Sequence, residues 1–513
     1  MYKRLIVLLL VAAWALQINA AQPQTALEES GWKSLTSYEQ LMGYLEQLVD
    51  SSSSVDLKTI GTSASGREIP ALFFSTDPVF ASRRDEKPLV LIFCQQHGNE
   101  PSGKEAALIV ARKLLGEDAG LLDKLDLILV PQVNPDGSEA GQRHNANDMD
   151  LNRNHVILSE PESHALHGLF LDWMPEVALD VHEYNAVLSR WIEEGYIKDA
   201  DEMLGGVTNL NIDAGIMRFT RDIFIPETGK GIEADGFRFH RYIVGEPFDG
   251  NVVRYSTTAI NDGRQSLGIY NTLSFIFEGK RYGNLTNELE KRTEGQVSAI
   301  INFLATINRH ADETLSIVKK ARAGMADQRQ AHIQMDYFPD ANQPTLKFPV
   351  FDLNSWTHTT KDLESYRPRV LVKKSVAKPA AYSFAATETK LIALLERHRI
   401  GMLSLGKDQR TTTETYLIKH VTDIIDEEKP ALLVDLDKAI SDETLEKGTI
   451  VVPVTGPASN FIPLMLEPES SWCIVTSRGA GKYRFAEYLS EGKPYPIKRL
   501  ASIGGLELTA LKD

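Results

Sequence analysis

The first half of the chain contains four short apolar runs, at residues 88–94, 125–130, 177–181 and 272–277. Near-continuous apolar runs of this length are typical of parallel strands that are buried on both faces. A helical pattern of apolar residues over 103–115 separates the first two runs. This succession of strand, helix and strand predicts an α/β domain with a mixed, largely parallel sheet flanked by helices.

Two further helices are predicted on either side of these strands. Apolar residues share one helical face over 37–49, and residues 288–307 are predicted to form another long helix. A chain of 513 residues is too long for one typical domain. We therefore expect a first domain over residues 25–310.

The pattern changes after the second of these helices. Residues 311–345 are polar and irregular and are expected to form a connector. Beyond it, short strands at 370–372 and 450–454 alternate with a helix over 388–397. This alternation predicts a separate, smaller α/β or β-rich domain over 346–513.

The N-terminus has the layout of a secretory signal peptide. Lys3 and Arg4 precede an apolar run at 5–16, which is short for a membrane span. We expect residues 1–20 to be removed and the protein to be exported, to the periplasm or the exterior, without a stable membrane span. An uncleaved membrane anchor is the alternative.

Composition narrows the function classes. A formal net charge of −15 and the lack of a basic block disfavour nucleic-acid binding. The two cysteines, Cys94 and Cys473, fall in different predicted domains, so no disulfide framework is expected. Cys94 lies in an apolar run and is expected to be a buried free thiol. The oligomeric state stays open.

Polar or ionisable residues follow the predicted strands. His97 and Glu100 come after the first strand, Asn134 after the second, His182 after the third and Glu278 after the fourth. Ligands bind at the carboxyl ends of the strands in an open α/β sheet. We therefore expect these distant residues to meet in one crevice.

His97, Glu100 and His182 are the candidate metal ligands. A catalytic zinc ion is usually bound by three imidazole or carboxylate ligands, which leave one position for water. The pair His97 and Glu100 alone also fits a loop histidine and a glutamate that begins a helix. The rival histidine ligands are His144, His155, His164 and His167.

Glu278 is the candidate general base. A carboxylate directly after a buried strand is partly desolvated, which raises its pKa and suits it to take a proton from the attacking water. The alternative is a capping or salt-bridged glutamate. The polar segment 143–154 carries Arg143 and Arg153, and guanidinium groups bind carboxylates and developing oxyanions. This pair suggests a substrate with a free carboxylate, or else a solvated loop.

In combination, these motifs resemble the carboxypeptidase A family of zinc metallopeptidases over about residues 30–310. The matching residues, in the family's order, are His97-Gly-Asn-Glu100, Asn134-Pro-Asp-Gly137, Arg143, Asp150-Leu-Asn-Arg153, His182 and Glu278. The resemblance implies a zinc carboxypeptidase-like fold and one zinc ion held by His97, Glu100 and His182. Glu278 would be the general base and acid.

The resemblance also implies roles for the polar segment. Arg143 would polarise the scissile carbonyl and stabilise the oxyanion, while Asn152 and Arg153 would bind the terminal carboxylate of a peptide substrate. Asp150 would orient the ligating imidazole of His97. One departure is Asn99, which stands where the family usually has an arginine in the first motif.

Other departures leave the substrate pocket undefined. Glu100 and His182 are 82 positions apart, fewer than in the digestive enzymes, so surface loops should be shorter. Tyr255 and Tyr270 compete for the role of the family's mobile tyrosine. In the expected specificity pocket, Asp262 would favour a basic side chain and Arg264 an acidic one. The C-terminal region resembles the accessory domain of larger bacterial exported members, through Glu414-Thr-Tyr416, Val451-Val-Pro453 and Leu466-Glu-Pro468.

Three functions follow as hypotheses. The first is a zinc metallocarboxypeptidase that removes C-terminal residues from peptides. The second is a zinc amidase that acts on peptidoglycan stem peptides or another non-standard amide. The third is a non-catalytic peptide-binding relative that keeps the fold, which the complete set of candidate catalytic residues disfavours.

Overall fold

The computed structural model describes residues 23–76, 86–426, 429–476 and 485–511. The predicted signal peptide over 1–20 lies outside the described residues. Among those described, no helix combines the length and the apolar character that crossing a membrane requires.

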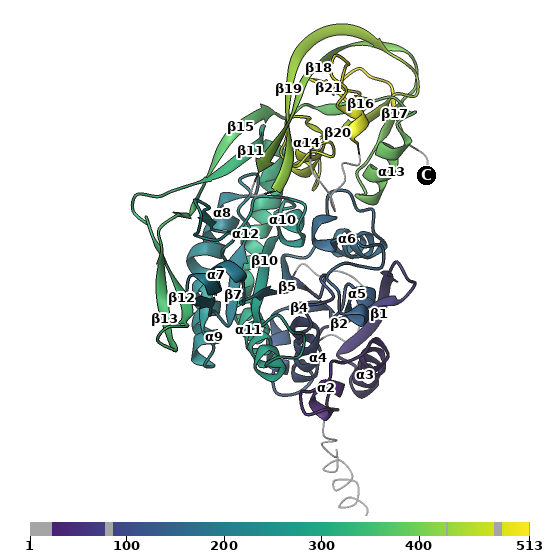
Figure 1. Cartoon of the computed structure of the whole chain (residues 1–513). Coiled ribbons are helices and arrows are strands. Elements are labelled where there is room, and N and C mark those ends of the chain that lie inside the picture. Colours follow the sequence, from purple (N-terminus) through teal and green to yellow (C-terminus); the bar gives the residue numbers. More distant parts are fainter. Residues whose placement is uncertain (1–22, 77–85, 427–428, 477–484, 512–513) are drawn as a thin grey trace, which may run out of the picture.

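An eight-stranded mixed sheet forms the centre of the first region (Figure 1). Its strands, in spatial order, are β1 (Val55–Thr62), β2 (Glu68–Phe74), β4 (Asp126–Val130), β3 (Leu89–Cys94), β5 (Val177–Asn185), β10 (Leu273–Arg281), β7 (Glu202–Gly206) and β8 (Phe239–Arg241). The four middle strands are parallel, whereas β2 and β7 pair antiparallel with them on either side. These four are the strands predicted from the apolar runs, so the predicted fold class is confirmed.

Helices α3 (Tyr38–Ser51), α4 (Ser102–Leu114) and α11 (Leu289–Arg309) agree with the predicted helices. The side chain of Ser37 accepts a hydrogen bond from the backbone N–H of Gln40, which fixes where α3 begins. Helix α4 contacts α3, α11 and strands β3, β4 and β5, so these helices form a layer on the sheet. Cys94 is buried and free, as predicted.

The C-terminal part is rich in antiparallel strands. A seven-stranded sheet has the spatial order β19 (Lys429–Leu445), β18 (Gln409–Asp426), β21 (Lys498–Leu500), β16 (Ala381–Phe384), β20 (Ile450–Pro453), β17 (Leu403–Leu405) and β22 (Leu508–Ala510). The long hairpin β18–β19 arches away from the rest of this sheet in Figure 1. Helix α13 (Thr389–Arg397) lies where a helix was predicted.

The expectation of an irregular connector over 311–345 was wrong for most of that segment. Helix α12 (Ala311–Gly324) and strand β11 (Gln330–Phe338) occupy it, and β11 pairs with β15 (Arg369–Ala377). Apolar residues recur at every second position of β11, which buries one face of the strand. Because polar residues alternate with the apolar ones, this segment looks like a polar connector in the sequence.

The two regions also share a smaller sheet. Strand β12 (Leu346–Asp352) pairs with β13 (Thr357–Leu363) on one side and with β6 (Tyr196–Lys198) on the other. Val350 lies opposite Lys198 in this pairing. Residues beyond 345 therefore complete a sheet that begins in the first region, while the division into two domains stays a prediction.

Candidate metal centre and active site

The ends of three neighbouring parallel strands bring the candidate residues together. His97 and Glu100 lie in the turn between β3 and α4, His182 lies in β5, and Glu278 lies in β10. Glu278 is the register partner of His182 in the parallel pair of β5 and β10. Residues in register on adjacent strands project to the same face of a sheet, so Glu278 emerges beside His182.

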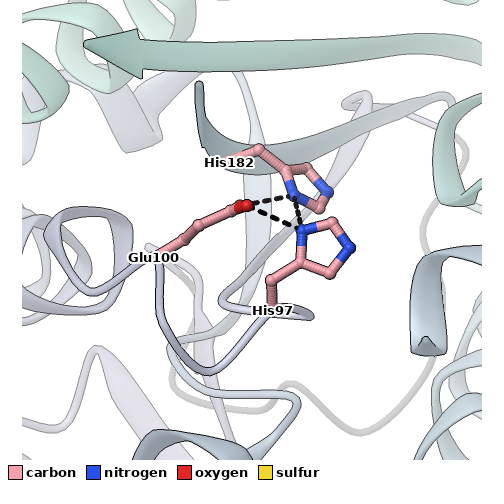
Figure 2. A group of neighbouring side chains, drawn as sticks. All are labelled: His97, Glu100 and His182. Carbon is pink, nitrogen blue, oxygen red and sulfur yellow. Dashed lines mark hydrogen bonds and ion pairs between the residues drawn. The ribbon is translucent and has the colours of Figure 1, made fainter. Parts of the chain in front are cut away.

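His97, Glu100 and His182 form a closed, buried triangle (Figure 2). Nδ1 of His97 lies 2.9 Å from Oε1 of Glu100, and Nδ1 of His182 lies 2.9 Å from Oε2 of Glu100. The two Nδ1 atoms are 3.1 Å apart. Within the described residues, this is the one group of three or more histidine, cysteine or carboxylate side chains able to hold a metal ion.

The triangle fits the donor set of zinc. Bonds of about 2.0–2.1 Å in a tetrahedral site separate the ligand atoms by about 3.3 Å, which is close to the distances observed here. Burial disfavours the charged form of Glu100, yet the neighbouring His97 and His182 hold the pKa of Glu100 well below its usual range. Burial likewise opposes protonation of His182, but Asp180 and Glu100 raise its pKa well above normal. Both shifts result from the attraction between the carboxylates and the imidazoles of this cluster.

Carboxylates stand behind both imidazoles. Nε2 of His97 lies 3.1 Å from Oδ1 of Asp150, and Nε2 of His182 lies 2.8 Å from Oδ1 of Asp180. Glu100 in turn accepts a hydrogen bond from the backbone N–H of Glu183 at 3.1 Å. These contacts leave Nδ1 of each histidine free to face the centre of the triangle.

The polar segment that follows α5 (Pro135–Ala140) lines the same site. Arg143 donates to Asp150 from Nε at 3.1 Å and from Nη2 at 3.0 Å, and its Nη1 lies 3.4 Å from Glu100. Nδ2 of Asn152 lies 3.1 Å from Nε2 of His182, and Arg153 donates to the backbone carbonyl of Asn152 at 2.5 Å. The structure thus brings these residues to the cluster, while their roles with substrate stay predictions.

Glu278 has an unengaged carboxylate. None of the described residues forms a hydrogen bond or an ion pair with it, which argues against a capping or salt-bridged glutamate. Burial raises its pKa to about 7, Glu100 adds to this effect, and His182 opposes it. A carboxyl group with this pKa can both accept and return a proton near neutral pH.

Two residues near Glu278 had no signal in the sequence. The ammonium of Lys198 lies 4.7 Å from the ring centroid of Tyr184 and 5.7 Å from that of Phe348. Burial lowers the pKa of Lys198 to about 8, and the charge of Glu278 opposes this shift. Burial raises the pKa of Tyr242, and the nearby carboxylate of Glu278 raises it further. Lys198 ends the short strand β6 and Tyr242 follows the short strand β8. Strands of three residues are too short to show an apolar pattern in the sequence.

The two tyrosines singled out in the sequence lie elsewhere. Tyr270 is 1% exposed and packs against Phe170 and Phe461 in the core, with ring centroids 5.4 and 6.1 Å away. Tyr255 packs in the smaller core around Trp191. No ring contact between either tyrosine and the two histidines of the triangle is found among the described residues, and a role with substrate stays a prediction.

Asp262 and Arg264 are occupied with each other. Oδ1 of Asp262 accepts the N–H of Gln265 at 2.7 Å and caps α10 (Gly263–Gly268), while its Oδ2 lies 3.1 Å from Nη2 of Arg264. The two side chains are 4% and 1% exposed. The pair fixes the start of α10, while Nε and Nη1 of Arg264 are buried and have no hydrogen-bond partner among the described residues, so a role of either residue in specificity stays a prediction.

None of the rival histidines joins the triangle. His144 pairs with exposed Asp148, and His164 lines a separate hollow beside β1. His155 and His167 are buried and contact each other at 2.9 Å. His182 is therefore the histidine that completes the cluster.

Known proteins resemble this chain most clearly in the region of the cluster. Residues 41–189 match the family model for zinc carboxypeptidase. Carboxypeptidase 2 of Trichophyton rubrum is 28% identical over 308 residues, which cover 59% of this chain and 57% of that protein. Carboxypeptidase 2 of Trichophyton equinum is 28% identical over 478 residues, which cover 90% of this chain and 86% of that protein.

These matches cover only part of the chain or of the relative. The chain spans 57% of the length of the first of these relatives, and the family model ends before Glu278. A solved carboxypeptidase A of Helicoverpa armigera aligns with a TM-score of 0.43 at 18% identity, covering 60% of this chain and 82% of that one. The family match includes all three residues of the triangle. The comparisons therefore support the zinc carboxypeptidase family for the part of the chain that carries the candidate metal centre.

Proposed function

We propose that this chain is a zinc-dependent metallocarboxypeptidase, which hydrolyses the C-terminal peptide bond of peptides with a free terminal carboxylate. The observation that carries the proposal is the closed triangle of His97, Glu100 and His182 with the unengaged carboxylate of Glu278 on the next strand. Three ligands and a free general base are the minimal set for metal-assisted hydrolysis.

The residues of the chain would divide the chemistry between them. One zinc ion, when bound, lowers the pKa of water and polarises a carbonyl group. Glu278 would take the proton of the attacking water and deliver it to the leaving amine, for which a pKa of about 7 is well suited. Arg143, oriented by its two hydrogen bonds to Asp150, would stabilise the oxyanion.

Arg153 and Asn152 would recognise the terminal carboxylate. A guanidinium binds a carboxylate in bidentate fashion, and the partly buried position of Arg153 would strengthen this contact. The side-chain oxygen of Asn152 accepts the N–H of Gly263 at 2.7 Å, which holds the amide at the edge of the site. A substrate without the carboxylate would leave the cationic group without its partner.

The experiment compares peptides that differ only at the C-terminus. The purified protein is assayed for zinc by elemental analysis and for release of the last residue from a peptide with a free or an amidated end. We expect about one zinc ion per chain and hydrolysis of the free peptide alone. Equal cleavage of both peptides, or cleavage of cell-wall fragments instead, would favour the amidase; peptide binding without metal would favour the non-catalytic relative.

We also propose that the protein acts after export. The support is the arrangement of Lys3, Arg4 and the apolar run at 5–16 in the sequence. Fractionation of cells that produce the full chain, with N-terminal sequencing of the mature protein, tests this. A mature N-terminus near residue 21 is expected, and a protein that starts at Met1 in the cytoplasm would refute export.

A further inference from the structure

A chain of buried polar side chains leads from the candidate metal ligand His182 into the protein. Asp180 precedes His182 by two positions in β5, so both side chains point to the same face of the sheet. Oδ1 of Asp180 lies 2.8 Å from Nε2 of His182, which is an ion-pair contact outside hydrogen-bond geometry, and Nδ2 of Asn152 lies 3.1 Å from the same nitrogen. Oδ2 of Asp180 accepts a hydrogen bond from Nε2 of Gln96 at 2.8 Å. The carboxylate of Asp180 thus lies between the imidazole of His182 and the side-chain amide of Gln96.

The chain continues through two histidines. Oε1 of Gln96 lies 2.8 Å from Nε2 of His155, and Nδ1 of His155 lies 2.9 Å from Nε2 of His167 in helix α6 (Pro161–Trp173). Gln96, His155 and His167 are each at most 1% exposed. No water can therefore replace a lost partner at low cost along this path.

The carboxylate fixes the direction of every hydrogen bond in the chain. Since the NH2 group of Gln96 faces Oδ2 of Asp180, its carbonyl oxygen faces His155. His155 then carries its proton on Nε2 and accepts at Nδ1, so His167 must donate from its own Nε2. The Nδ1 atom of His167, left with a lone pair, has no hydrogen-bond partner among the described residues.

The protonation of the two histidines agrees with this direction. Burial lowers the pKa of His155 to about 4 and that of His167 well below its usual range. Both rings are therefore neutral near pH 7, which leaves each with one donor and one acceptor. A chain of alternating donors and acceptors requires each ring to be neutral, with one donor and one acceptor.

We propose that Gln96, His155 and His167 are positioning residues of the metal centre, which hold the carboxylate of Asp180 against His182 so that His182 turns Nδ1 toward the other two ligands. The inference rests on the zinc site proposed above. Partners behind a metal ligand fix its ring orientation, and their loss typically costs 10–100-fold in metal affinity. Here the support extends three residues beyond the carboxylate, into α6.

The test measures the zinc dissociation constant by competition with a chromophoric chelator. Gln96→Leu removes both hydrogen bonds of the amide, and we expect the constant to rise about 10–100-fold. His155→Phe keeps the bond between Gln96 and Asp180 and should give a smaller rise. Gln265→Leu is the matched control, because Gln265 is an equally buried amide whose hydrogen bonds go to Thr208 and to the backbone.

The outcomes separate this inference from the proposed function. A Gln96→Leu protein within about twofold of the wild-type constant, or a Gln265→Leu protein with the same loss, would overturn the positioning role alone. A wild-type protein that binds no zinc would overturn both proposals. Should Gln96→Leu not fold, ¹⁵N spectra of histidine-labelled wild-type protein decide the matter, since an Nδ1–H tautomer of His155 contradicts the chain.

Discussion

Replacing Glu278 with glutamine separates catalysis from metal binding. The amide has the shape of the carboxyl group but cannot accept the proton of the attacking water. Loss of a general base typically costs 10²–10⁴-fold in turnover, or about 3–5 kcal/mol in activation free energy. Since Glu278 makes no hydrogen bond or ion pair with the described residues, Glu278→Gln should keep its zinc and change KM little.

The same substitution has a signature in stability. A carboxyl group shifted from 4.5 in the unfolded chain to about 7 in the folded protein disfavours folding once it ionises. The penalty is absent below about pH 4.5, grows as the pH rises to about 7, and then reaches about 3 kcal/mol at most. Metal-free Glu278→Gln should therefore match the metal-free wild type near pH 4.5 and be more stable at pH 8.

The assay combines three measurements on one pair of proteins. These are kcat on a free-carboxylate peptide, zinc content, and urea unfolding of the chelator-treated proteins at pH 4.5 and pH 8. Glu202→Gln is the control, because Glu202 is a buried glutamate on the neighbouring strand β7 whose pKa is likewise raised by burial. Full turnover by Glu278→Gln, or an equal loss in Glu202→Gln, would refute the role of Glu278.

Substitutions at three other positions probe the surroundings of the triangle. Lys198→Met removes a positive charge that lowers the pKa of Glu278, so the acidic limb of kcat/KM should move to higher pH, while Lys198→Arg should leave it in place. Arg153→Ala should lower kcat/KM for free-carboxylate peptides about 10–100-fold and abolish the preference over amidated ones. In Gly263→Ala, the new Cβ would lie 2.6 Å from Oδ2 of Asp180, so urea unfolding should show a loss of about 1–3 kcal/mol. A stable Gly263→Ala protein would mean that this junction can relax.

The approach of Glu278 to the metal-binding triangle could be anticipated because these residues lie at the ends of strands with strong apolar patterns. His182 and Glu278 follow runs that are buried on both faces, and parallel pairing then forces them side by side. Only the general topology of an α/β sheet was needed to predict that they meet. The contacts behind the ligands could not be predicted in this way, because no sequence pattern links Asp180 with Gln96.

The residues around Glu278 could not be predicted, because they depend on pairing between distant and short strands. Lys198 ends the three-residue strand β6, whose partner β12 begins more than 140 positions later in the chain. Tyr242 follows β8, another three-residue strand. Such strands carry too few residues for an apolar period, and their position is fixed by tertiary contacts alone.

These contacts lead to a prediction about the region beyond residue 345. Trp191 and Met203 are buried in a small core together with Phe348 and Val350, which β12 supplies. A fragment that ends at residue 345 would expose this core and remove the ring of Phe348 from beside Lys198.

We therefore expect a fragment of residues 23–345 to be less stable than the full chain and to lose activity even though it keeps every residue of the triangle. Loss of the buried ring of Phe348 alone would cost about 3–5 kcal/mol of stability, as for the removal of other large aromatic side chains from a core. Thermal unfolding and kcat/KM of the two proteins measure this. Phe348→Ala in the full chain, which removes the ring but keeps β12, separates the packing of Phe348 from the strand pairing. A fragment with wild-type stability and activity would show that the catalytic unit ends at the boundary predicted from sequence, and that β12 merely lies against it.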